Sequence, residues 1–153
     1  MTDERLSDLE EAAWGGFLNT HTRLWRVLEA RLAPTGVTMA EYDVLTALEG
    51  AGDDGVRMSD LAARRLMSTG GFTRMADRLE KQGLITRQRS AVDGRGLNAV
   101  ITPAGLERLG RARRSHLEDV RTLFLGRLTS AELHQLSVIW ERLGDEGHPQ
   151  AHC

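Results

Sequence analysis

The chain has 153 residues, a formal net charge of −2, 41% hydrophobic and 27% charged residues, which is typical of a soluble globular protein and excludes a disordered or fibrous one. No run approaches the roughly 18 apolar residues that a membrane span requires. The acidic beginning MTDERLSDLEE lacks the basic region and apolar core of a signal peptide, so we expect a cytoplasmic protein without membrane contact.

The single cysteine, Cys153, is the last residue of the sequence. It excludes an internal disulfide and a CxxC pair for a metal or for redox chemistry. The nearby His148 and His152 lack the regular spacing of a metal site. We therefore expect no metal and no cofactor.

Two helices are predicted before residue 50. Apolar residues from Leu6 to Leu32 follow a helical stripe, and Pro34 ends that segment. Thr38 and Glu41 form a capping-box pattern, which predicts the start of a second helix.

A helix pair and a hairpin are predicted between residues 59 and 101. The third helix is expected at about Ser59–Leu66, and Ser68 is a good N-cap for the fourth. Strands at Leu84–Arg89 and Leu97–Ile101 flank an Asp-Gly pair, which is a strong hairpin signal. Two short helices followed by a β-hairpin predict a winged helix-turn-helix.

The fourth helix divides into two faces. Four apolar residues share one of them: Phe72, Met75, Ala76 and Leu79. This spacing leaves polar residues on the remaining sides of the helix: Thr69, Thr73, Arg74, Asp77 and Arg78. We expect the polar face to be offered to a groove of DNA.

Positive charge is concentrated in the same region. From Arg57 to Arg95 there are nine Lys or Arg residues and four acids, a net charge of +5, which leaves −7 for the rest of the chain. A basic segment within an acidic chain favours binding to a polyanion. A chance cluster on a solvated face is the alternative interpretation.

Two more helices are predicted after the hairpin. Thr102 before Pro103 is a helix start, and the fifth helix is expected to reach about Leu125. Thr129 and Glu132 form another capping box, which opens a sixth helix. Its apolar residues are spaced as a seam for a partner helix: Leu133, Leu136, Trp140 and Leu143.

These elements predict a mainly α chain with a small β-hairpin wing, an α+β fold. We expect a winged helix-turn-helix at residues 38–102 and a helical dimerisation region at 6–33 and 103–146. A homodimer is expected because the first and last helices carry more apolar surface than the small winged region alone can cover.

The segment DLAARRLMSTGGFTRMADRLEKQGLITRQRSAVDGRGLNAVITPAG at 60–105 resembles the signature of the MarR (multiple antibiotic resistance regulator) family. Its most specific parts are RMADRLEKQG at 74–83, Asp93-Gly94-Arg95 and the TPAG motif at 102–105. The resemblance implies a homodimer with the fourth helix of each subunit in a major groove of DNA and each wing in the adjacent minor groove.

The resemblance also implies the residues that contact DNA. The start of the fourth helix is matched by these residues: Ser68, Thr69, Gly71, Thr73 and Arg74. Arg95 matches the wing arginine that enters the minor groove, and Asp93 matches the acid that orients it, although the two residues can also simply brace the hairpin. We add the basic residues Arg78 and Arg89 to this candidate interface.

Members of this family commonly release DNA when a small, often aromatic or phenolic, compound binds between the dimer base and the DNA-binding head. The resemblance therefore implies a repressor of a pseudo-palindromic operator with such an effector. His21, Trp25 and Tyr42 are candidate lining residues. Aromatic residues at helical spacing are more often core, and that simpler interpretation also stands.

An enzyme is not expected because the chain contains no GxSxG, phosphate-loop or HExxH motif. A winged helix used only as a protein-interaction module is the alternative to a DNA-binding regulator. Salt dependence separates the two, because binding to DNA weakens steeply with salt.

Overall fold

The computed structural model describes residues 5–64, 69–89 and 96–144. Helices dominate these ranges, and a small antiparallel sheet accompanies them, which confirms the expected mainly α fold with a β wing. The elements are, in order: α1 (Asp8–Leu32), α2 (Met39–Ala51), β1 (Val56–Arg57), α3 (Met58–Arg64), α4 (Thr69–Lys81), β2 (Ile85–Arg89), β3 (Leu97–Ile101), α5 (Pro103–Leu123) and α6 (Ser130–Gly144), with single 3-10 turns at Ala33–Thr35, Gly52–Asp54 and Leu125–Arg127.

The sheet has one strand more than the sequence predicted. Its order is β1-β3-β2, and both pairings are antiparallel. Strands β2 and β3 form the predicted hairpin, with Ile85 opposite Ile101 and Arg89 opposite Leu97. In the additional strand β1, Val56 pairs with Ala99 of β3. Because α3 follows β1 directly, this pairing holds the start of α3 beside the wing.

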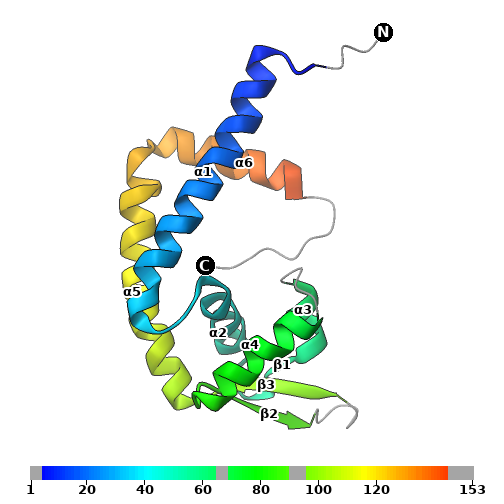
Figure 1. The fold of residues 1–153 in the computed structure, drawn as a ribbon. Coiled ribbons are helices and arrows are strands. Elements are labelled where there is room, and N and C mark those ends of the chain that lie inside the picture. Colours follow the sequence, from blue (N-terminus) through cyan, green and yellow to red (C-terminus); the bar gives the residue numbers. More distant parts are fainter. Residues whose placement is uncertain (1–4, 65–68, 90–95, 145–153) are drawn as a thin grey trace.

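The molecule has two parts, which Figure 1 shows at opposite ends. The head consists of α2, β1, α3, α4, β2 and β3. The base consists of α1, α5 and α6: α1 packs against α5, and α6 crosses α1 at the end away from the head. No helix of the described residues is long and apolar enough to cross a membrane.

The buried hydrophobic core lies in the head. The predicted inner face of α4 is confirmed, because Phe72, Met75, Ala76 and Leu79 are all buried. They belong to the same core as residues from α2 and from the first half of α5, among them Leu45, Leu48, Leu109 and Ala112. Because α5 begins in the head core and ends in the base, one continuous helix joins the two parts.

Close backbone packing fixes the beginning of α5. Thr102 caps this helix, as predicted: its Oγ1 accepts a hydrogen bond from the Gly105 amide at 3.0 Å and donates one to the Gly83 carbonyl at 2.6 Å. Gly83 ends α4 with φ of 71°, a conformation that favours glycine. A Cβ at Gly105 would lie 2.1 Å from the carbonyl oxygen of Leu84, so only glycine fits there.

Two predicted boundaries need correction. The first wing strand begins at Ile85 rather than Leu84, because the Leu84 amide donates to the Leu79 carbonyl and closes the end of α4. The fifth helix ends at Leu123 rather than Leu125, because Phe124 leaves the helical conformation with φ of −130°.

Candidate nucleic-acid interface

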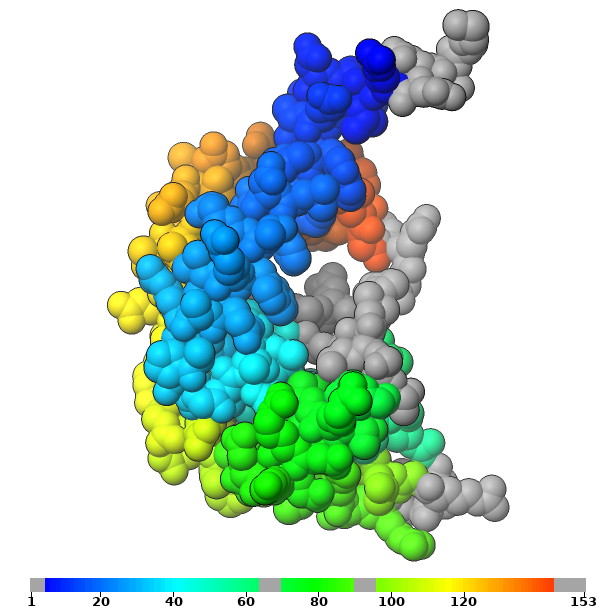
Figure 2. All heavy atoms as spheres, viewed as in Figure 1, coloured from blue at the N-terminus to red at the C-terminus, as the bar shows by residue number. Residues whose placement is uncertain are grey.

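The outer face of α4 is an exposed polar surface of the head. The core holds its apolar side inward, and the side chains of Thr73, Arg74, Asp77 and Arg78 are exposed. Figure 2 shows α4 in green across the surface of the head, unobstructed by the helices of the base. The predicted division of faces is therefore confirmed for these four polar residues, and the side chain of Thr69 lies outside the described part of the chain.

The predicted contact residues at the start of α4 are only partly described. Thr69 is the first residue of the helix, Gly71 is half-buried, and Thr73 and Arg74 are exposed. Arg74 forms no ion pair with any described residue, so its guanidinium is available to a ligand. Ser68 lies outside the described residues.

Arg78 lies one turn after Arg74 and is held by an acid from another helix. Its Nε donates to Oε1 of Glu41 in α2 at 2.7 Å. The Glu41 side chain is 3% exposed, whereas that of Arg78 is 53% exposed. The pair therefore has a buried carboxylate on one side and a solvent-facing guanidinium on the other.

A second arginine joins the wing to α4. Arg87 of β2 donates from Nη2 to Oδ1 of Asp77 at 2.5 Å, and its Nε lies 3.6 Å from Oε2 of Glu80. The amide of Arg87 also donates to Oε1 of Glu80, at 3.1 Å. Two acids of α4 thus orient the hairpin relative to the helix, and they neutralise one of the positive charges counted in this region.

Only one of the three candidate residues of the wing belongs to the described residues. Arg89 is the last residue of β2, and it is exposed. Asp93 and Arg95 lie outside the described residues, so their roles stay predictions from the resemblance.

The three candidate ligand residues do not form one aromatic cluster among the described residues. The rings of His21 and Trp25 stack on α1, with centroids 5.9 Å apart, and Trp25 is 43% exposed. Tyr42 is 1% exposed, and its ring packs at 4.8 Å on His116 of α5. Tyr42 is thus part of the core where α2 meets α5, as the simpler interpretation of aromatic spacing expects.

His116 is a buried polar residue that is not among the candidates expected from the sequence. It is 4% exposed, and its Nδ1 has no hydrogen-bonding partner among the described residues. Burial lowers the pKa of His116 below its usual value, because desolvation disfavours the imidazolium form. A signal was present in the sequence, since His116 follows the buried Leu109 and Ala112 at helical spacings of seven and four.

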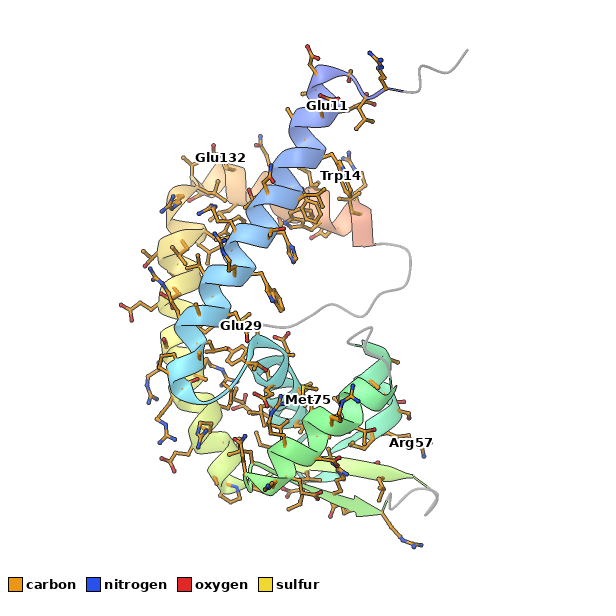
Figure 3. All side chains as sticks on the ribbon, in the orientation of Figure 1. Glu11, Trp14, Glu29, Arg57, Met75 and Glu132 are labelled. Carbon is orange, nitrogen blue, oxygen red and sulfur yellow. The ribbon has the colours of Figure 1, made fainter. Side chains whose placement is uncertain are left out.

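Polar contacts tie the head to the base. The Met39 amide at the start of α2 donates to Oε2 of Glu29 in α1 at 2.9 Å, and Figure 3 shows Glu29 at this junction. Within the base, Arg31 of α1 pairs with Asp119 of α5 at 2.5 Å. The latter contact holds α1 and α5 in a fixed register.

Arginines of α5 also contact the head. Arg113 pairs with Glu49 at the end of α2. The hydrogen bond that Arg113 donates to the Glu49 carboxylate is the main cause that raises the pKa of Arg113 above its usual value. Arg108 lies close to the Gly36 carbonyl before α2, at 3.5 Å. No group of three or more described His, Cys, Asp or Glu residues is arranged to hold a metal ion.

Two short helices, the second with an exposed polar face, and a β-hairpin after them define a winged helix-turn-helix protein. The model of the MarR family matches residues 35–96. AbsC, a MarR family transcriptional regulator from Streptomyces coelicolor, has a similar structure: the TM-score is 0.84 and the identity 32%, over 94% of this chain and 97% of that one.

Two further relatives agree with this match. Sco3205, a MarR family transcriptional regulator of Streptomyces coelicolor solved in complex with DNA, has a TM-score of 0.86 and 26% identity, over 98% of this chain and 95% of that one. The transcriptional repressor MdtR of Bacillus subtilis is 27% identical over 92% of this chain and 86% of its own length. The chain belongs to the MarR family of transcriptional regulators, and it is not an enzyme.

Proposed function

We propose that this protein is a repressor that binds a pseudo-palindromic DNA operator as a homodimer and is released by a small aromatic or phenolic ligand. In this proposal α4 lies in the major groove, with contacts from Ser68, Thr69, Gly71, Thr73 and Arg74. Arg78 and Arg89 contact the DNA backbone, and Arg95, oriented by Asp93, enters the minor groove.

The main support for DNA binding is the exposed polar face of α4. Arg74 is exposed there without an ion-pair partner among the described residues, on a helix whose opposite face is fixed in the core. Arginine forks recognise guanine edges and phosphates, and a helix of this diameter fits the major groove. Sco3205, which is similar in structure, was solved in complex with DNA, and this supports DNA binding by the present chain.

Dimerisation is supported by the apolar surface of the base. The large exposed apolar residues of α1 and α6 include Leu9 (80% exposed), Trp14 (56%), Trp140 (45%) and Leu143 (68%). Phe17 joins these helices through a ring contact with Trp140, at 5.8 Å. Figure 3 shows Trp14 on the part of α1 that α6 crosses. Exposed apolar side chains on two neighbouring helices favour burial against a second copy.

The effector site is proposed between base and head. The exposed stack of His21 and Trp25 offers apolar walls, and the buried Tyr42 beside His116 offers polar atoms at the junction of α2 and α5. A ligand bound there would act on the contacts that join the two parts, and so on the distance between the two heads of a dimer.

A mobility-shift experiment on the DNA that flanks the gene of this protein tests the proposal. The wild-type dimer is expected to shift one short duplex specifically, with affinity that falls steeply as salt rises. Some member of a panel of aromatic acids and phenols is expected to abolish the shift. Binding that is weak, equal for all duplexes and insensitive to salt would contradict the proposal and favour a protein-interaction module.

A further inference from the structure

The buried carboxylate of Glu41 serves two elements of the head at once. Its Oε2 accepts a hydrogen bond from the Thr38 amide at 2.8 Å, which closes the capping box of α2. Its Oε1 accepts a hydrogen bond from Nε of Arg78 in α4 at 2.7 Å. One side chain therefore fixes both the start of α2 and an arginine of the candidate recognition helix.

The other two capping boxes of the described residues lack such a link. In the boxes of α1 and α6, the acids Glu10 and Glu132 are exposed, and a single oxygen of each receives both the amide and the hydroxyl of the N-cap residue. Helix capping alone therefore does not require the burial of Glu41 or its contact with a distant helix.

The Glu41–Arg78 pair leaves part of the arginine available. A buried carboxylate is costly unless it is paired, and the guanidinium of Arg78 provides the opposite charge. Arg78 uses only Nε for this contact, and its side chain is 53% exposed. Nη1 and Nη2 form no hydrogen bond to any other described residue, so they remain free to bind an anion.

We propose that Glu41 is a positioning residue for DNA binding: it holds the Arg78 guanidinium so that Nη1 and Nη2 meet a phosphate of the DNA backbone. This inference rests on the proposed function. A guanidinium that is already oriented loses less conformational entropy when it binds a phosphate than a freely rotating one. Glu41 itself touches no DNA and acts through Arg78.

Loss of the negative charge of Glu41 changes the affinity for DNA in opposite directions under the two explanations. Removal of a carboxylate from a basic DNA-binding head should strengthen binding if only the net charge matters. Positioning predicts the opposite, because the oriented phosphate contact is lost. Glu41→Gln keeps the shape of the side chain and one oxygen for the Thr38 amide, but it removes the ion pair.

The test measures the affinity for a duplex that the wild-type protein selects from a random-sequence pool, over a range of salt concentrations. Glu41→Gln is expected to bind about tenfold more weakly and with a shallower dependence on salt. Arg78→Gln is expected to show a similar loss, with the slope of log affinity against log salt reduced by up to about two units per dimer. In the Arg78→Gln background, Glu41→Gln is expected to cause no further loss.

Two controls separate positioning from folding and charge. Glu132→Gln changes the matching acid of the capping box in α6, and Asp53→Asn removes an exposed acid of the head. Neither is expected to weaken binding. Arg78→Lys keeps the charge without disturbing the buried cap, and it is expected to behave like Arg78→Gln, because an ammonium cannot serve Glu41 and a phosphate in the same fork geometry.

Several results would overturn the inference. They are an unchanged or tighter affinity of folded Glu41→Gln, a loss that persists undiminished in the Arg78→Gln background, or an Arg78→Lys variant that binds like the wild type. If these occur while Arg74→Ala still weakens binding, the proposed function stands and only the role of Glu41 fails. A wild-type protein that selects no duplex would overturn both.

Discussion

Arg74 and Arg78 lie one turn apart on α4, but their surroundings differ. Arg78 is anchored to Glu41, whereas Arg74 has no ion-pair partner among the described residues. An anchored side chain suits a fixed backbone contact, and an unanchored one can adapt to base edges. The two residues are therefore expected to affect specificity differently.

Arg74→Ala is expected to reduce affinity for the operator more than affinity for random DNA, by roughly 1–3 kcal/mol per half-site, because a base contact distinguishes sequences. Titration of both duplexes by fluorescence anisotropy measures the difference. Arg111→Ala, which removes an exposed arginine of α5, is the matched control and should change neither affinity. Equal losses on the two duplexes would assign Arg74 to a phosphate instead.

His116 makes the stability of the fold depend on pH. Burial lowers its pKa in the folded protein below the usual value of 6.5, although Asp43 and Asp119 oppose this shift. The unfolded chain therefore takes up the proton at higher pH than the folded chain. The stabilisation from neutral His116 is complete above about pH 6.5, and it is lost as the pH falls through the folded pKa.

His116→Phe is expected to remove this part of the acid sensitivity, because phenylalanine does not titrate. Urea unfolding at about pH 8 and at about pH 5.5 measures the loss of stability on acidification, which should be smaller in the variant than in the wild type. The control is His134→Phe, at an exposed position of α6. An identical acid response in His116→Phe and wild type would refute the role of His116.

The sequence predicts single residues best where a local pattern decides their environment. The exposure of Thr73 and Arg74 follows from the helical spacing of their apolar neighbours. The roles of Glu41 and His116 depend on partners that are far away in the sequence, at Arg78 and Tyr42. A capping box identifies Glu41 but does not reveal that its second oxygen reaches another helix.

At the scale of elements, β1 was missed because it has only two residues. Val56 and Arg57 are too few for an alternating pattern, and their strand exists only because β3 lies beside them. The capped helices and the Asp-Gly hairpin were predicted, since their signals are contained within each segment. The contacts between elements could be identified only from the three-dimensional structure.

The contact between α5 and the beginning of the wing depends on Gly105. Gly105→Ala is expected to destabilise the fold by roughly 1–3 kcal/mol, because its Cβ would meet backbone that cannot move independently. Gly110→Ala in the same helix is the matched control: its Cβ would lie 4.0 Å from Nη1 of Arg114, so higher helix propensity should stabilise by up to about 1 kcal/mol. Urea unfolding of both variants checks the opposite signs, and equal effects would contradict the steric explanation.

At the scale of the whole molecule, the head contains the buried core while the base leaves apolar residues exposed. Trp140→Asp is therefore expected to convert a micromolar dimer into monomers, because it places a charge in the proposed interface beside Phe17. Sedimentation measures the mass. Gln135→Asp, at an exposed polar position of α6, should leave the dimer intact. A well-folded wild-type monomer at this concentration would exclude the proposed dimer.

The length of α5, which runs without interruption from the head to the base, fixes the distance and the rotation between these two parts. With 21 residues, α5 is about 30 Å long, and Arg31 of α1 locks its register through Asp119. Because the α5 residues up to His116 pack on the head, one residue inserted between His116 and Asp119 would turn the head by about 100° and advance it by about 1.5 Å relative to the base. In the proposed dimer, two such rotated heads would no longer face half-sites one turn of DNA apart. The length of α5 would thus determine which spacing of half-sites the dimer can bind.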